Sequence, residues 1–292
     1  MKVDFFIIGT QKSGTTNLAY LLSKSLHIIT HPQLECTFFY NDNEYQKGLK
    51  YLQKTYFYHH KKITKSPTYY LLKSGAAYTH IDSIKRALDH NPDMKFLMIF
   101  RNPINRFISS YYMECARNVY HNTLEKTIDI ALNNPASIEH KIFYRLGLYD
   151  YWLKQILPII PIASREIFIF EDLYTNKEAH LLDFAKKYNL ELSASAINGH
   201  EIKNSAKSFN NKGYQKLIVK LKNSIARPII KSILPVPLWV NLTQVIENSN
   251  LIEPQDTPIV DENLKDRLRE AYAQSILNFE KIIGVKTNWL NG

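Results

Sequence analysis

Two short stretches of the sequence carry residues that could bind phosphate groups. Residues 9–16, with the sequence GTQKSGTT, combine two glycines, a lysine and several hydroxyl side chains. Residues 101–112, with the sequence RNPINRFISSYY, begin with Arg101 and carry Ser109 further along. The planar guanidinium of an arginine suits bidentate contacts to phosphate oxygens. Together the two stretches predict a site for a ligand that carries more than one phosphate group.

The first stretch lies between a predicted strand and a predicted helix. Residues 3–8 are mostly apolar, which is typical of a strand buried on both faces of a parallel sheet. Leucines from Leu18 onward recur at helical spacing, so the loop places main-chain N–H groups at a helix N-terminus, where anions are stabilised. In a Walker A loop a lysine directly follows the second glycine, whereas here Thr15 occupies that position and Lys12 lies inside the loop. The loop is therefore predicted to bind phosphate with a displaced lysine.

The remaining elements predict an α/β fold, P-loop NTPase-like, with three α/β/α layers around a central parallel sheet. Further strands are expected at residues 27–30, 95–100 and 166–170, and helices at residues 18–26, 44–54, 76–88, 147–157, 176–188 and 261–283 and from residue 103 onward. Residues 65–70 are expected to be extended or to turn, because Pro67 restricts its neighbour. Ligands of such sheets bind beyond the carboxyl ends of the strands, where both phosphate-binding stretches begin. Without repeats or a convincing linker, residues 1–292 are predicted to form one domain.

The composition indicates a folded protein that attracts acidic partners. Of its 292 residues 45% are hydrophobic, and the formal net charge is +10. This charge suits nucleotides, polyanionic glycans and anionic lipids alike. Two cysteines without a Cys/His cluster predict no disulfide scaffold and no metal site, and they suit a reducing compartment. The predicted strand begins directly after Met1 and Lys2, and no apolar run approaches the roughly 20 residues of a membrane span, so we expect a cytoplasmic protein.

Residues 203–250 differ in composition from the rest of the chain, with lysines that alternate with apolar residues. Residues 203–231 could form a basic amphipathic helix on a membrane or glycan surface. A packed helix with a solvated lysine face is the simpler interpretation.

Several carboxylates and a histidine compete for the chemical roles. Glu35 follows the second predicted strand and could act as a general base, or it could be a surface carboxylate. His31 lies close to it in the sequence and is an alternative base. Glu171 and Asp172 follow the strand at residues 166–170 and could hold Mg²⁺, which keeps a P-loop kinase as an alternative. Arg106 is expected to pair with a carboxylate for structural reasons.

The two phosphate-binding stretches resemble cofactor-binding segments of sulfotransferases that use 3′-phosphoadenosine 5′-phosphosulfate (PAPS). GTQKSGTT is similar to their 5′-phosphosulfate loop, and RNPINRFISSYY is similar to their 3′-phosphate segment, which has the form RxPxxRxxSxY. Glu35 with the aromatic residues after it, and KSPTY at residues 65–69, resemble the heparan sulfate branch of that superfamily. The resemblance spans roughly residues 3–190. Lumenal eukaryotic members of this branch carry a membrane anchor and a C-terminal disulfide loop, and their lack here favours a bacterial cytoplasmic enzyme.

The resemblance implies a role for each matching residue. Lys12 would offset charge on the leaving phosphate, Glu35 would take a proton from the acceptor, and Lys65 would assist near the sulfuryl group. Residues 205–213 are a loose counterpart of a late cofactor loop. The implied cofactor contacts are Lys12, Ser13, Gly14, Thr15, Thr16, Arg101, Ser109, Lys212 and Gly213.

The implied reaction is sulfuryl transfer from PAPS to a hydroxyl or amine of a carbohydrate or glycolipid, without a metal ion and without a nucleic acid partner. Such a transfer needs in-line placement of donor and acceptor, a base beside the acceptor and cations beside the leaving group. Two alternatives stay open at this point. One is a P-loop kinase that uses Mg-ATP, and the other is a polyanion- or membrane-binding module built on residues 203–231.

Overall fold

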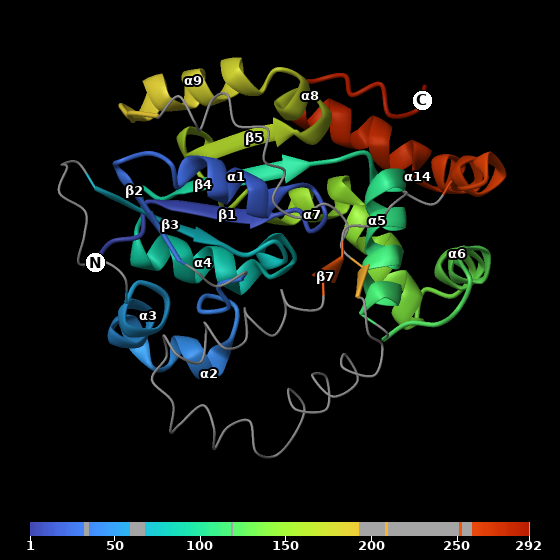
Figure 1. Cartoon of the computed structure of the whole chain (residues 1–292), viewed down its shortest axis with the longest axis horizontal. Helices are drawn as coiled ribbons and strands as arrows, with labels where there is room; N and C mark the ends of the chain where they lie inside the picture. The colour runs from blue at the N-terminus through green and yellow to red at the C-terminus, as the bar shows by residue number, and fades with distance from the viewer. Residues whose placement is uncertain are drawn as a thin grey trace.

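The computed structural model describes residues 1–31, 35–58, 68–117, 119–192, 208–209, 251–252 and 259–291. Within these residues the core is a five-stranded parallel sheet with the strand order β2-β3-β1-β4-β5 (Figure 1). Its strands are β1 (Phe5–Gly9), β2 (Ile28–Thr30), β3 (Tyr69–Lys73), β4 (Lys95–Phe100) and β5 (Arg165–Ile169). The predicted α/β fold with a central parallel sheet is confirmed.

The central strand β1 is apolar throughout because both of its faces are covered. Successive side chains of a strand point to opposite faces. Phe5 and Ile7 accordingly join one buried cluster, and Phe6 and Ile8 join the other. A strand of this kind reads as an uninterrupted hydrophobic run rather than as an alternating pattern.

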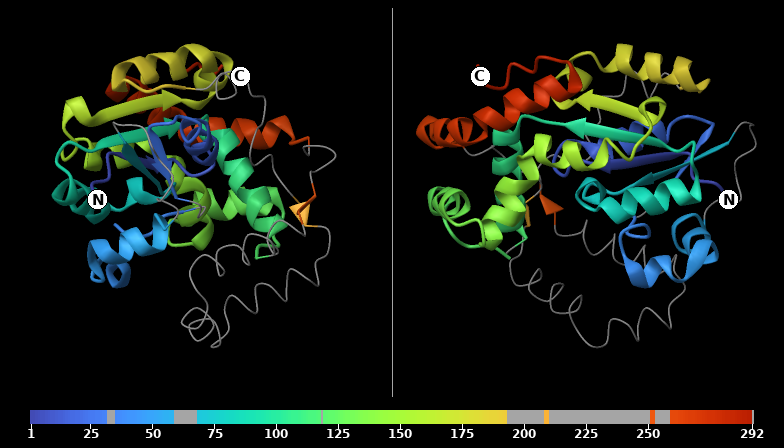
Figure 2. Two further views of the ribbon diagram at one scale, coloured as in Figure 1. Left: turned by 60° about the vertical axis from the view of Figure 1, so that its left-hand side comes forward. Right: turned by 180° about the vertical axis from the view of Figure 1, so that it is seen from behind.

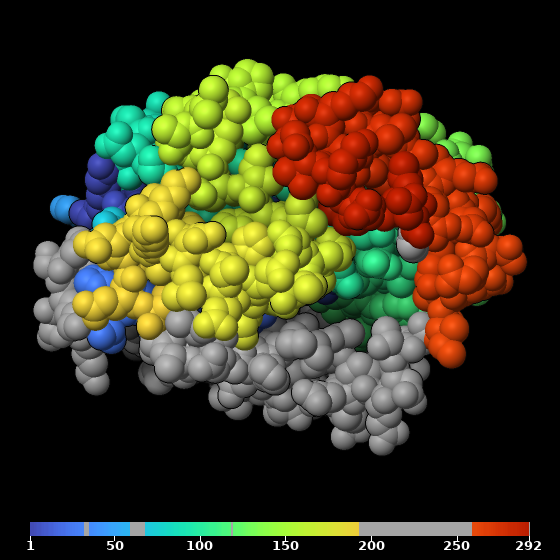
Figure 3. Space-filling view, turned by 90° about the horizontal axis from the view of Figure 1, so that it is seen from above, coloured from blue at the N-terminus to red at the C-terminus, as the bar shows by residue number. Residues whose placement is uncertain are grey.

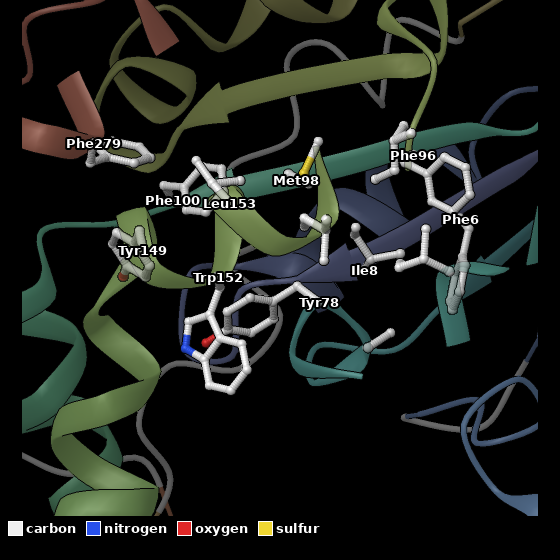
Figure 4. Close-up of a cluster of buried hydrophobic side chains, with 14 of the residues drawn as sticks. Phe6, Ile8, Tyr78, Phe96, Met98, Phe100, Tyr149, Trp152, Leu153 and Phe279 are labelled. Atoms are coloured by element: carbon white, nitrogen blue, oxygen red, sulfur yellow. The ribbon is translucent and has the colours of Figure 1, made fainter. Parts of the chain in front are cut away.

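Helices cover each face of the sheet. The cluster around Phe5 is closed by α1 (Thr15–Leu22) and α9 (Lys177–Tyr188). The larger cluster around Phe6 includes side chains from α4 (Ile81–His90), α7 (Tyr149–Ile156) and α14 (Glu262–Ile283). Figure 4 shows the second cluster, where residues of β1 and β4 face Tyr78, Trp152 and Leu153. These two cores hold the sheet and therefore fix where its strands end.

The other helices border the sheet or connect its parts. Figure 2 shows α14 next to α5 and α7 from two further directions, in agreement with their contacts. The remaining α-helices are α2 (Asp42–Tyr45), α3 (Gly48–Tyr56), α5 (Pro103–Ala116), α6 (Leu124–Asn133) and α8 (Phe170–Thr175). Single turns of other helix types are η2 (Ala77–Thr79), η3 (His140–Tyr144), η4 (Arg145–Gly147) and η5 (Ile162–Ser164), and two short strands, β6 (Ser208–Phe209) and β7 (Leu251–Ile252), pair antiparallel. None of the described helices is long and apolar enough to cross a membrane.

Three elements differ from the sequence-based expectation. Strand β3 was not foreseen, because residues 65–70 were expected only to be extended or to turn, yet its residues pair with both β1 and β2. The helix expected at residues 44–54 is two helices, separated just before Gly48, whose φ is +73°. The helix expected at residues 76–88 is also divided, because His80 adopts an extended conformation between η2 and α4.

The C-terminal residues pack against the region that follows β5, as Figure 3 shows. Trp289 stacks on Phe279 at a ring distance of 5.3 Å, and its Nε1 donates to Glu171 Oε2 at 3.1 Å. Glu171 Oε1 accepts from the main-chain N–H of Asn102 at 2.9 Å. The C-terminus therefore braces the segment that directly follows Arg101.

Gly14 ends the first loop in a left-handed conformation with φ +78°. A Cβ at this position would lie 2.8 Å from the Tyr174 hydroxyl oxygen and 3.0 Å from the Phe170 ring. Gly284, at the end of α14, has φ +72°, and apart from the adjoining chain no described atom lies within 4 Å of its Cβ position. We expect Gly284→Ala to lower the free energy of unfolding by about 1 kcal/mol through backbone strain alone.

The matched Gly14→Ala variant is expected to lose about 2–3 kcal/mol, because overpacking adds to the same strain. Urea unfolding of the two variants beside the parent protein measures both values. Equal losses of unfolding free energy in the two variants would show that Tyr174 and Phe170 move aside without an energetic penalty.

Candidate active site

The predicted phosphate-binding stretches meet at the carboxyl edge of the sheet. Strand β1 leads into residues 10–14, and β4 leads into Arg101, with both strands parallel and adjacent. Arg101 Nη1 donates to the main-chain oxygen of Lys12 at 3.1 Å. Two stretches about ninety residues apart in the sequence are thus directly joined.

Hydroxyl groups of the phosphate loop form hydrogen bonds with β4 and with each other. The main-chain N–H of Thr10 donates to Ile99 O at 2.8 Å, and Thr10 Oγ1 donates to the same oxygen at 2.9 Å. The hydroxyl groups of Thr10 and Ser13 lie 2.6 Å apart, and both residues are fully buried. Ser13 therefore contributes its side chain to the loop's own structure.

Helix α1 begins directly after this loop and points its N-terminus at the site. Its N-cap residue is Gly14, which has no side chain to satisfy the first N–H groups. Such groups, together with the helix dipole, favour an anion. Thr16, in the first turn, is half-buried, and its hydroxyl oxygen accepts from Lys73 Nζ at 3.1 Å.

The side chain of Lys12 extends from the loop to Met113 of α5 and lies in a largely buried, cationic environment. Burial, and then the neighbouring Arg117 and Arg101, lower its pKa to about 8. Its Nζ donates to Met113 Sδ at 3.4 Å. A thioether is a weak acceptor, so an anion that replaced Met113 would bind the ammonium more strongly. Ser109 lies one helical turn before Met113 on the same face of α5, which places it on the Lys12 side of the site.

Arg101 is positioned by contacts on several sides. Its guanidinium lies 4.7 Å from the ring centre of Phe170, and Tyr149 Oη donates to its main-chain oxygen at 2.8 Å. Burial lowers the pKa of Arg101, and its buried Nε has no hydrogen-bond partner among the described residues. A guanidinium with an unused buried donor fits the recognition of a phosphate group.

Glu35 is tied to the phosphate loop through a lysine that sequence analysis missed. Lys73, the last residue of β3, donates from Nζ to Glu35 Oε1 at 2.7 Å as well as to Thr16. The main-chain N–H of Gly75 donates to Glu35 Oε2 at 2.7 Å. The Lys73 side chain is only 3% exposed, whereas that of Glu35 is 45% exposed. Glu35 is therefore a half-exposed carboxylate beside the loop, and each of its oxygens accepts a hydrogen bond.

The sequence-based choice of lysine was Lys65, which lies outside the described residues, as do Lys212, Gly213 and nearly all of residues 203–250. The signal that points to Lys73 was present in the sequence. A charged residue closes the apolar run YYLL, and a parallel strand places its last residue at the edge where ligands bind. That signal depends on β3 being a strand, which the local sequence pattern alone does not show.

His31, the alternative base, is engaged in the fold. Its Nε2 accepts from the main-chain N–H of Lys73 at 3.0 Å, and the residue is buried. Its ring packs edge-on against Tyr56 at a centroid distance of 5.7 Å. A nitrogen that already accepts a main-chain hydrogen bond is poorly placed to take a proton from a ligand, which favours Glu35.

The other polar residues singled out from the sequence serve structural contacts. Both oxygens of Glu171 are taken up by Trp289 and Asn102, and Asp172 accepts from Asn176 Nδ2 at 2.7 Å. These contacts weaken the case for a kinase-type Mg²⁺ site. Arg106 was expected to pair with a carboxylate, but it is fully buried and donates to the main-chain oxygen of Phe143. A main-chain carbonyl of η3 is its acceptor instead.

Fold and site together define an α/β protein whose parallel sheet carries a helix N-terminus, cationic side chains and a carboxylate at its carboxyl edge. Residues 2–225 match the sulfotransferase domain family, so this chain belongs to that family. Proteins of the family take the sulfuryl group from PAPS and release 3′-phosphoadenosine 5′-phosphate (PAP).

Comparison with individual proteins agrees with this family. Heparan sulfate glucosamine 3-O-sulfotransferase 5 from Mus musculus is 28% identical over 198 residues, which cover 66% of this chain and 55% of that protein. The chain spans about half the length of the curated relatives of this name. The crystal structure of a sulfotransferase from Alicyclobacillus acidocaldarius covers both chains fully with a TM-score of 0.62 and 14% identity. The sulfotransferase domain from the curacin biosynthetic pathway gives a TM-score of 0.51 at 12% identity, over 94% of this chain and 97% of that one. These two structures share the fold.

Proposed function

We propose that this protein transfers a sulfuryl group from PAPS to a hydroxyl or amine group of a carbohydrate or glycolipid. The observation that carries the proposal is the chain of contacts from Glu35 through Lys73 to Thr16. It links a half-exposed carboxylate, the natural base for an acceptor, to the helix N-terminus that would hold the donor. The mouse relative named as a glucosamine O-sulfotransferase supports a sugar as the acceptor.

The residues present fit the donor. Among the described residues, Arg101 Nε has no hydrogen-bond partner and Lys12 Nζ contacts a thioether, and Gly14 leaves the N-terminus of α1 without a side-chain cap. Each of these features would be satisfied by a phosphate oxygen. Lys12 and the α1 N-terminus would hold the 5′-phosphosulfate, and Arg101 with Ser109 would hold the 3′-phosphate. When bound, PAPS supplies an activated sulfuryl group on a phosphate leaving group.

In the proposed reaction Glu35 accepts the proton of the acceptor group. The acceptor oxygen or nitrogen forms a bond to sulfur while the bond from sulfur to the bridging phosphate oxygen breaks. Lys12 then stabilises the charge that develops on the released phosphate. Lys73 and the Gly75 N–H orient the two oxygens of Glu35, so the base is positioned before the acceptor arrives.

The experiment that tests the proposal measures cofactor binding and then transfer. Calorimetry with PAP is expected to show binding that weakens strongly in Lys12→Ala and Arg101→Ala. Incubation with sulfur-labelled PAPS and a panel of glycans is then expected to label a carbohydrate. If PAP did not bind, or if Mg-ATP displaced it efficiently, the proposal would be wrong and a kinase would be favoured.

Two further parts of the proposal concern the whole protein. We place the reaction in the cytoplasm within a single domain of residues 1–292, on the evidence of cysteine content and sequence texture. Contact of residues 203–231 with a membrane or glycan surface also stays a proposal, because these residues lie almost wholly outside the described ones. Salt-sensitive binding to anionic vesicles that survives Lys12→Ala would support that contact.

The low pKa of Lys12 makes cofactor affinity depend on pH. In the free protein its pKa is about 8. Bound phosphate groups raise that pKa, so above pH 8 binding must first protonate the lysine. We expect the Kd for PAP to increase about tenfold between pH 7 and pH 9. Calorimetry at several pH values measures this, and Lys12→Ala is expected to bind weakly with a nearly flat profile. A steep profile in Lys12→Ala would assign the titration to another group.

A further inference from the structure

A polar pocket of about 340 Å³ lies between the N-terminal end of α4 and the segment that follows Glu35. Residues that line it include Tyr40, Asp42, Thr79, His80, Asp82 and Arg86. These residues come from two segments of the chain, residues 40–42 and residues 79–86, which approach each other between α2 and α4 (Figure 1).

Both segments start at the proposed base. One begins with Glu35 itself and reaches Tyr40 five residues later. The other begins with Lys73 and Gly75, which both donate to Glu35, and reaches His80 after the turn η2. The main-chain N–H of Cys36 donates to Lys73 O at 2.8 Å and fixes the segments side by side. The pocket therefore lies between two segments of the chain that are both tied to Glu35 by hydrogen bonds.

An aromatic stack forms one wall of the pocket. The rings of Tyr40 and His80 stack with centroids 4.9 Å apart and an angle of 25° between their planes. His80 Nδ1 lies 3.1 Å from both Ala76 O and Thr79 Oγ1, which fixes the ring. Burial raises the pKa of Tyr40, and the nearby Glu35 carboxylate raises it further, so the stack begins close to the base. The apolar C–H face of a sugar ring packs well on such an aromatic surface.

Among the described residues that line the pocket, the only lysine or arginine is Arg86, and it is paired. Arg86 pairs with Asp42, donates to Phe39 O at 3.1 Å and lies 4.6 Å from the centre of the Tyr45 ring. Asp82 is largely exposed, with Lys85 Nζ 4.0 Å away. Carboxylates at such positions accept hydrogen bonds from sugar hydroxyl groups. A sulfate or uronate group would instead meet two carboxylates whose cations are already engaged, which is unfavourable.

We propose that this pocket is the acceptor subsite and that it holds an uncharged saccharide ring on the Tyr40–His80 stack. The inference rests on the proposed sulfuryl transfer and adds the acceptor class. The ring's neighbouring hydroxyl group then faces Glu35, and the carboxylates of Asp42 and Asp82 bind other hydroxyl groups. A heavily sulfated glycan is a poor acceptor for this chain, even though its curated relatives are named for heparan sulfate.

The test compares neutral and polyanionic tetrasaccharides as acceptors with labelled PAPS. The neutral probes are cellotetraose, mannotetraose and N-acetylchitotetraose, and the polyanionic probe is a heparan sulfate tetrasaccharide. At least one neutral probe is expected to show a kcat/KM more than tenfold above that of the heparan probe. His80→Ala is expected to raise the acceptor KM about fivefold to tenfold while kcat and the Kd for PAP stay within about twofold. His180→Ala, on α9, is the matched control and leaves all three values unchanged.

If His80→Ala folds poorly, a charge-reversal variant at Asp82 tests the same pocket. Asp82→Lys is expected to raise kcat/KM for the heparan probe relative to the neutral probe at least threefold. If no neutral probe is bound or sulfated, if the heparan probe is preferred, or if His80→Ala leaves KM unchanged, the acceptor assignment is wrong. Loss of PAP binding in the parent protein would instead overturn the proposed function itself, so the two failures are distinguishable.

Discussion

Glu35→Gln is expected to lower kcat for sulfuryl transfer by about 10²–10⁴-fold, the usual contribution of a positioned general base. Glutamine keeps the length and shape of the side chain but cannot accept a proton from the acceptor. The Kd for PAP is expected to stay within about twofold, because the hydrogen bonds that join Glu35 to Thr16 run through Lys73 among the described residues. Steady-state kinetics with labelled PAPS and calorimetry with PAP measure the two quantities.

The control for this prediction is His31→Asn. His31 accepts a main-chain hydrogen bond from Lys73, so its replacement is expected to reduce stability and to disturb activity modestly. It should leave the shape of the pH–rate profile unchanged. The opposite pattern, with most activity kept in Glu35→Gln and lost in His31→Asn together with a changed profile, would make His31 the base.

The parts of the fold that sequence analysis predicted correctly are those with strong local signals. Strands β1 and β4 are buried on both faces and appear as uninterrupted apolar runs. Helix α5 begins with Pro103, and the N-cap of α14 is Asp261. Both residue types are common at these positions and therefore indicate a helix start in the sequence. The phosphate loop was found for the same reason, since its glycines and hydroxyl residues stand between a strand and a helix.

The parts that were missed depend on contacts between distant residues. Strand β3 lies close to a proline in the sequence, and only its pairing with β1 and β2 makes it a strand. The division before α3 follows from a single left-handed residue, Gly48, which periodicity does not detect. The local sequence pattern indicates which faces of a helix or strand are buried. Which strand pairs with which, and which side chains meet, depends on residues far apart in the sequence.

The same distinction applies to the site. Lys12, Arg101 and Glu35 belong to recognisable local sequences, and the structure brings the first two into direct contact. Lys73 belongs to no such sequence motif. Its place in the site follows from the hydrogen bonds that its ammonium group donates to Glu35 and Thr16. The pairing of Tyr40 with His80 likewise joins two segments that the sequence separates by forty residues. Residues that position others are therefore harder to find than residues that bind ligand directly.

Lys73→Met is expected to lower kcat by about 10²-fold or more, since it removes the cation that joins the base to the donor loop. Methionine retains an apolar stem of similar length, so the buried space stays filled. Because Glu35 is 45% exposed, water can replace the lost ammonium at the carboxylate. We therefore expect the free energy of unfolding to fall by only about 1–2 kcal/mol. Kinetics and urea unfolding of the same sample separate the two effects.

Lys65→Met is the matched comparison, because Lys65 is the lysine that the family resemblance selects and Lys73 is the one that contacts Glu35. If position at the carboxyl edge decides the role, Lys73→Met loses far more activity than Lys65→Met, and Lys73→Arg recovers part of it through the same two acceptors. A larger loss in Lys65→Met would mean that Lys65, two residues before Pro67, reaches the sulfuryl group itself. In that case the contact between Lys73 and Glu35 would serve only to hold β3 against the loop.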